Sequence, residues 1–312
     1  MSLTHSIIAI SLSVLTLCGS AVAGVPKDLP YPTGSDLTGK QVAEQVYFVN
    51  HFYANKNYSV QKDGRNVAVI FNRTKGKTPK TITLSRYINN DYNDGKLIAR
   101  DMTLFQSGKL KGTSMLITDF ADDNKSQSYA IWLPQLRKIN RFANPGHEDS
   151  WGNSDFTSGD VTLRKPEHET HEILGKEKFD ECLGTMVMPK SYRSKYTRNL
   201  PGPKCVKGRD IYKLKSTTKF PDWWYDYRLS YVDAESFSDH RTEYFKNGKM
   251  IKVVDRDWGS FGEADKRSQY WNYWYGKTLA TGHETWMIIP EGITHKNSEL
   301  KSDFWSTESL KQ

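Results

Sequence analysis

Along most of the chain, apolar and polar positions alternate with the period of two that is typical of β-strands. Such runs lie near residues 67–72, 82–84, 98–104, 115–117, 129–133, 183–188, 211–214, 223–231, 241–246, 250–255, 270–275 and 283–289. Turn sequences separate many of them, and Asn247-Gly248 is the strongest hairpin signal. The pattern predicts an antiparallel meander of about ten strands.

One segment near the N-terminus has the helical period instead. Over residues 36–53, Val42, Val46 and Val49 fall on one stripe at helical spacing. Thr38 followed by Gln41 predicts a capping box at the start of this helix. We expect the helix to lie across the sheet through its apolar stripe.

Residues 1–23 have the pattern of a signal peptide. An apolar run from Ile7 to Leu17 precedes the small residues of Ala21-Val22-Ala23. Cys18 raises the alternative of a lipoprotein acylated on that cysteine, but the bulky Leu17 before it favours cleavage after Ala23. The prediction is an exported chain whose residues 24–312 form a single domain.

Cleavage there leaves two cysteines, Cys182 and Cys205. In an oxidising compartment, the simplest expectation for such a pair is a disulfide. Two unpaired buried thiols are the alternative.

The stretch from Ser128 to Leu163 combines a strand, a proline that ends regular pairing, a basic segment and a loop rich in Gly, Asn, Asp and Ser. It resembles the LolA-like outer-membrane lipoprotein-sorting proteins. The resemblance rests on Tyr129-x-x-Trp132-Leu133-Pro134-x-x-Arg137-Lys138, then Gly152-x-x-Asp155-Phe156-x-x-x-Asp160, and on the tail from Asp303 to Leu310.

The resemblance implies a mostly β fold: a strongly curved antiparallel half-barrel with the N-terminal helix across its concave face. It also implies a periplasmic carrier of a lipid or lipid-modified ligand, with an inner-membrane RND-type exporter as a partner and no cofactor. The loop at 140–160 is the expected gate, with Phe156 in the lid.

Charge narrows the choice of partners. The formal net charge is +8, and the predicted signal peptide contributes none of it. The basic residues are interspersed with acidic ones, which argues against nucleic acid. They suit anionic headgroups or an acidic partner, with Arg137, Lys138 and Arg141 as the predicted contact. A merely solvated surface is the alternative.

Catalytic motifs are scarce. The chain has no G-x-S-x-G elbow, no glycine-rich phosphate loop and no C-x-x-C. His168-x-x-His171 lacks the Glu and the third ligand of a zinc site, so we expect no metal. The sequence predicts a binding protein rather than an enzyme. A glycosidase needs only two carboxylates from anywhere in the fold, so an enzyme stays a third hypothesis.

Aromatic and methionine residues supply the candidate ligand contacts, because flexible thioethers suit an adaptable apolar cavity. The predicted lining consists of Met102, Leu104, Met115, Ile117, Trp132, Phe156, Met186, Met188, Trp286 and Ile288. The alternative is a carbohydrate- or envelope-polymer-binding protein that stacks sugars on Trp223, Trp271 and Trp274. Rings exposed in a row would favour it.

Overall fold

The computed structural model describes residues 24–34, 36–122, 125–142, 144–184, 188–192, 205, 207–290 and 292–311. The first seven strands are β1 (Asn57–Val60), β2 (Ala68–Arg73), β3 (Lys80–Asn89), β4 (Leu97–Phe105), β5 (Ser114–Phe120), β6 (Ser128–Leu133) and β7 (Lys138–Phe142). The others are β8 (Glu169–Phe179), β9 (Arg209–Thr218), β10 (Tyr227–Asp233), β11 (Asp239–Lys246), β12 (Lys249–Ser260), β13 (Gln269–Thr278), β14 (His283–Ile288) and β15 (Thr294–Lys296).

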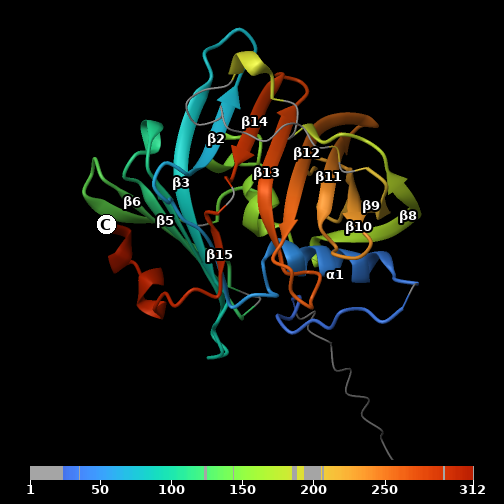
Figure 1. The fold of residues 1–312 in the computed structure, drawn as a ribbon, viewed down its shortest axis with the longest axis horizontal. Helices are drawn as coiled ribbons and strands as arrows, with labels where there is room; N and C mark the ends of the chain where they lie inside the picture. Colours follow the sequence, from blue (N-terminus) through green and yellow to red (C-terminus); the bar gives the residue numbers. More distant parts are fainter. Residues whose placement is uncertain are drawn as a thin grey trace, which may run out of the picture.

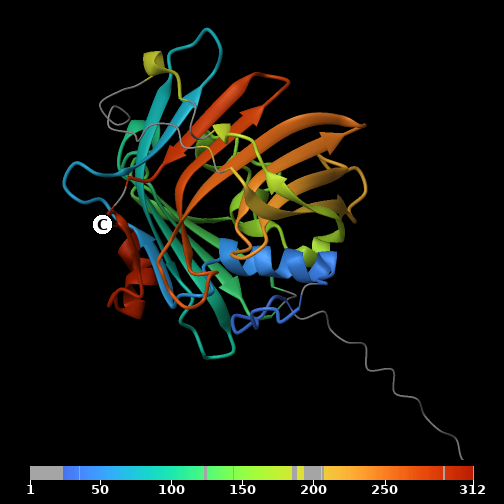
Figure 2. The ribbon, with the colours of Figure 1, turned by 45° about the vertical axis from the view of Figure 1, so that its right-hand side comes forward.

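These strands form one antiparallel sheet with the order β7-β6-β5-β4-β3-β2-β14-β13-β12-β11-β10-β9-β8, while β15 pairs with β1 and β1 with β3 (Figure 1). Within the described chain the sheet is open, because β7 and β8 pair on one side only. Its two wings face each other across a concave side (Figure 2). The predicted half-barrel is confirmed.

The two edges of the sheet are consecutive in the sequence. The segment between them, residues 144–168, must therefore pass from one edge of the open sheet to the other. We call it the strap. It contains the short helices at Trp151–Asn153, Gly159–Leu163 and Pro166–His168.

The N-terminal helix α1 (Gly39–Asn50) begins at the predicted capping box, in which the Thr38 hydroxyl accepts from the Gln41 N–H at 3.2 Å. Val42 and Val49 pack on Leu214 of β9 and on Val232 of β10. The helix therefore lies beneath the wing that contains β8 to β10 (Figure 2).

Two predicted strands are wrong in part. Residues 183 and 184 lie outside any strand, because a disulfide and its contacts hold them against the sheet's outer face instead. The strand expected from Trp223 begins only at Tyr227, because the successive residues Trp224 and Tyr225 both pack on Tyr244 and so do not alternate between faces.

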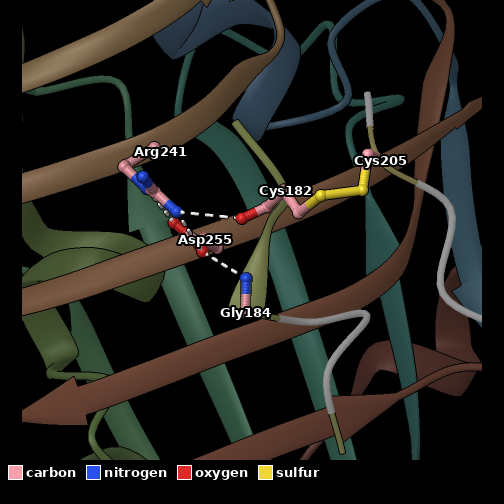
Figure 3. Close-up of a disulfide and its surroundings, with 5 residues drawn as sticks. All are labelled: Cys182, Gly184, Cys205, Arg241 and Asp255. Carbon is pink, nitrogen blue, oxygen red and sulfur yellow. Dashed lines mark hydrogen bonds and ion pairs between the residues drawn. A yellow bond between two sulfur atoms is a disulfide. The ribbon is translucent and has the colours of Figure 1, made fainter. Parts of the chain in front are cut away.

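The predicted disulfide is confirmed: Cys182 and Cys205 are joined, with their Cα atoms 4.4 Å apart (Figure 3). Arg241 donates to the Cys182 carbonyl at 3.4 Å, and the Gly184 N–H donates to Asp255 at 2.6 Å. The disulfide segment is therefore fixed to β11 and β12.

Candidate ligand-binding site

The strap fills the concave side with its own apolar side chains. Trp151, Phe156 and Val161 are 6 %, 0 % and 8 % exposed, and all three belong to the main core cluster. The Phe156 ring meets Trp274 of β13 edge-on, with centroids 5.1 Å apart. The loop that we predicted to be a gate is thus buried and fills the concave side. It begins after β7 rather than at residue 140.

Gly276 of β13 allows this close approach. A Cβ at that position would lie 2.8 Å from the Asp155 Cβ and 3.0 Å from the Phe156 ring, closer than real contacts allow. The missing side chain therefore makes room for the middle of the strap.

Asp155 fastens the strap to β13 and β14. Its carboxylate accepts from Thr278 at 2.5 Å and from Thr285 at 2.8 Å, and it pairs with His283 Nδ1 at 2.6 Å. The Asp155 N–H donates to Thr285 Oγ1 at 2.9 Å. The side chain and the backbone N–H of Asp155 are thus both hydrogen-bonded to the sheet.

Asp160 forms a second attachment, deeper in the concave side. Its carboxylate accepts from Lys252 at 2.5 Å, from Arg164 at 3.0 Å and from the Tyr244 hydroxyl. Burial alone would raise the pKa of Asp160, but the charges of Lys252 and Arg164 hold it well below its usual range. The strap therefore carries a buried, ionised carboxylate.

Glu169, the first residue of β8, continues this charged layer. It forms a two-pronged ion pair with Arg228 of β10, at 2.7 and 2.9 Å, and accepts from the Tyr225 hydroxyl at 2.9 Å. Burial opposes its charge, but Arg228 outweighs burial and lowers the pKa of Glu169 to about 2. Asp160 and Glu169 therefore both keep their negative charge at neutral pH inside this buried layer.

Two cavities remain beneath the strap. The first, of about 60 Å³, lies between α1, the strap and β10 to β12, and its polar lining includes His51, Asp160, Arg164, Arg228, Asp239 and Arg256. The second, of about 40 Å³, has the apolar side chains of Ile88, Ala99, Ile117 and Val161 in its lining. Asn50, His51, Val161 and Thr162 line both, so the two are neighbours.

Neither cavity has room for an acyl chain. At roughly 10–15 Å³ of such volume per water, the first holds about four or five waters. With the strap in place, neither of these two cavities between the described residues admits a large ligand.

The predicted lining residues do not come together. Met115, Ile117 and Phe156 face the concave side. Met102, Leu104 and Trp132 instead pack on the outer face under Trp305 and Leu310 of the C-terminal tail. Met188, Trp286 and Ile288 form a separate outer cluster, and Met186 lies outside the described residues. As ligand contacts they stay a prediction.

The predicted contact residues Arg137, Lys138 and Arg141 are all exposed, on and beside the turn between β6 and β7. Leu136 and Phe142 flank them, with exposed fractions of 57 % and 49 %. This edge hairpin therefore combines basic and exposed apolar side chains.

The ring platform of the carbohydrate hypothesis is absent from the described residues. Trp271 and Trp274 are 2 % and 0 % exposed, and Trp223 is partly buried against the same core. Sugars have no row of rings there on which to stack.

Among the described residues, no group of three His, Cys, Asp or Glu side chains could hold a metal ion. The ring of His171 instead contacts the Ser216 hydroxyl at 2.9 Å and the Pro166 carbonyl at 2.8 Å. No helix in the described part of the chain has the length and apolar character to cross a membrane.

Sequence reasoning missed the charged layer around Asp160. The only signal was that Lys252 and Arg256 stand at alternate positions of a strand, on the same face as the apolar Val254. Such a pattern places charges on a buried face, but it does not say which carboxylates meet them.

Comparisons with known proteins agree with this geometry. Residues 99–199 match a family model described as "-like: Uncharacterized protein". No curated protein matches the sequence.

Three solved structures are similar over 88 % of this chain. A DUF1329 family protein from Desulfovibrio piger is 15 % identical, with 100 % of it covered and a TM-score of 0.64. A putative outer membrane lipoprotein-sorting protein domain from Vibrio parahaemolyticus is 12 % identical, with 98 % covered and a TM-score of 0.63. A LolA superfamily protein from Nitrosomonas europaea is 10 % identical, with 100 % covered and a TM-score of 0.53. The chain therefore has a LolA-like fold.

Proposed function

We propose that this protein is a periplasmic carrier that binds a lipid or lipid-modified ligand in place of the strap. The main support for this proposal is that a single segment joins the two edges of an open LolA-like sheet. Its side chains Trp151, Phe156 and Val161 fill the concave side. When the part of the strap that carries these three side chains moves out, the concave face of the sheet becomes the surface for an acyl chain.

The energies of such an exchange are similar in size. Exposing three buried apolar side chains costs about 5–9 kcal/mol, at about 1.5–3 kcal/mol each. Burying a 14-carbon chain stabilises the complex by on the order of 10 kcal/mol, at about 0.8 kcal/mol per CH2. Because these apolar terms nearly cancel, the polar attachments at Asp155 and Asp160 decide how readily the strap gives way to a ligand.

The disulfide supports an exported protein, since disulfides persist in oxidising compartments. We propose that residues 1–23 are removed as a signal peptide after Ala23 and that residues 24–312 work as one domain in the periplasm. In this proposal the protein has no catalytic function.

We also propose that the β6–β7 hairpin makes the membrane or partner contact. Arg137, Lys138 and Arg141 would meet anionic headgroups, or an acidic surface of an inner-membrane RND-type exporter, while Leu136 and Phe142 enter the interface.

A crosslink between strap and sheet tests the exchange. Asp155→Cys with Gly276→Cys places two Cβ atoms 2.8 Å apart on this backbone, so the strap must move outward by about 1 Å to reach the Cβ separation of a disulfide. In the oxidised variant we expect uptake of a fluorescent acyl probe to fall at least tenfold below that of the same variant after reduction.

The reduced variant is the matched control, because it carries the same substitutions. The parent protein, taken through the same oxidation and reduction, accounts for effects on the native disulfide. Equal uptake by the oxidised and reduced variant would show that the strap does not gate binding.

A further inference from the structure

The first cavity is lined by three guanidinium groups, those of Arg164, Arg228 and Arg256. They form ion pairs with Asp160, Glu169 and Asp239 in turn. The lining therefore offers guanidinium N–H donors to a small anionic group.

Two histidines, His51 and His171, also line the cavity. Burial lowers the pKa of His51 to about 4 and lowers the pKa of His171. Both pKa values thus lie below the ordinary value of 6.5, so neither ring adds a positive charge to the lining at pH 7.

Two guanidinium N–H groups also lack acceptors. Arg164 uses Nη1 for Asp160 and Nε for the Tyr225 hydroxyl, and Arg256 uses Nη1 for Asp239 at 2.5 Å. Within the described part of the chain, Arg164 Nη2 and Arg256 Nε are buried without a hydrogen-bond partner. A buried donor left unpaired costs about 1–3 kcal/mol, so both N–H groups favour an acceptor bound in this cavity.

Arg256 is also held in place for such a role. Its side chain is 3 % exposed, and its guanidinium lies 4.2 Å from the centroid of the Trp274 ring. Trp274 in turn packs on Phe156 of the strap. A rigid, planar guanidinium suits the oxygens of a carboxylate or a phosphate.

We infer that this cavity binds the anionic head of an acidic amphiphile, a carboxylate or a phosphate, whose chain extends into the space that Trp151 and Phe156 now fill, while Arg164 stays in place next to β8. The volume of about 60 Å³ suits a single small anionic group. This inference rests on the proposed function, because the chain needs the space that the strap now fills. It adds that the ligand is an acid.

The test is isothermal titration of delipidated protein with myristate, with myristyl alcohol, and with sodium phosphate and acetate. Charge-assisted hydrogen bonds of about 1.5–3 kcal/mol predict that myristate binds about 10- to 100-fold more tightly than the alcohol of equal length. Arg164→Met should reduce the ratio of myristate affinity to alcohol affinity toward one, and Arg164→Lys should restore part of it.

Arg241→Met is the matched control, because Arg241 forms a partly buried ion pair with Asp255 away from the cavity lining. Arg256→Met serves as the second variant if Arg164→Met does not fold. Equal binding of acid and alcohol by the parent protein would overturn the inference and leave the carrier function standing.

Binding of phosphate or acetate, but of neither amphiphile, would keep an anion site and refute the carrier function. Binding of none of the four ligands would overturn both.

Discussion

At the scale of single residues, buried charge sets the character of the concave side. Asp160, Glu169, Arg228 and Lys252 are nearly inaccessible to water, yet each has a partner of opposite charge. Removing one partner of such a pair leaves the other charge buried without a counter-charge, which costs about 3–5 kcal/mol of folding free energy. The layer therefore fixes where the strap and β8 can lie.

Glu169 predicts how stability depends on pH. Its pKa in the folded state is about 2, against 4.5 ordinarily, so the ion pair with Arg228 stabilises the fold above pH 4.5. That contribution, about 3 kcal/mol, is lost as the pH falls from 4.5 through 2. We expect Glu169→Gln to lower the unfolding free energy at pH 7 and to flatten its decline below pH 4.5, measured by urea denaturation.

The outer-face Glu243→Gln is the control for this prediction, because the pKa of Glu243 is raised by burial rather than lowered. An unchanged slope below pH 4.5 in Glu169→Gln would show that this pair does not cause the acid sensitivity.

At the scale of elements, the edge hairpin of β6 and β7 exposes Leu136 and Phe142 beside three basic residues. Replacing Arg137, Lys138 and Arg141 by Ser should weaken binding to vesicles that contain phosphatidylglycerol. At about 1 kcal/mol per basic residue, the loss is about 100-fold, measured by vesicle co-sedimentation.

Lys176, Lys213 and Lys215, replaced by Ser, are the control, since they lie on β8 and β9. If both triple variants lose the same affinity, the hairpin is not a specific contact.

Local patterns predicted the elements well. The capping box at Thr38 and the hairpin at Asn247-Gly248 were both found where expected, because each depends on a few neighbouring residues. The half-barrel itself followed from the resemblance, since periodicity alone does not say whether a curved sheet closes.

The residues predicted to line a ligand cavity lie on two faces of the sheet, and the reason is physical. Successive side chains of a strand point to opposite faces, and a sequence does not say which face is concave. Met102 pairs with Leu116, and Thr103 pairs with Met115, so the two methionines are on opposite faces. The ion pair of Asp160 with Lys252, 92 residues apart, gave no local signal.

At the scale of the whole molecule, β14 pairs with β2 and so brings the C-terminal half of the sheet beside the N-terminal half. This leaves β7 and β8 as free edges and makes the strap the only segment of the described chain that joins them directly. Closure of the concave side therefore depends on one segment and its attachments.

The disulfide is the covalent restraint on this architecture. It closes a loop with a sequence separation of 23, which stabilises the folded state by about 3 kcal/mol. Cys182→Ser with Cys205→Ser should lower the unfolding free energy by that amount, measured by urea denaturation. Identical stability of variant and parent would show that the sulfurs are not joined in the protein.

We propose that the concave side carries an acidic, acylated ligand. Native mass spectrometry of the protein, purified from a periplasmic fraction, tests this directly. We predict a bound mass that organic extraction identifies as a fatty acid or an acidic lipid. Protein that is ligand-free and also takes up no fluorescent acyl probe would contradict the account.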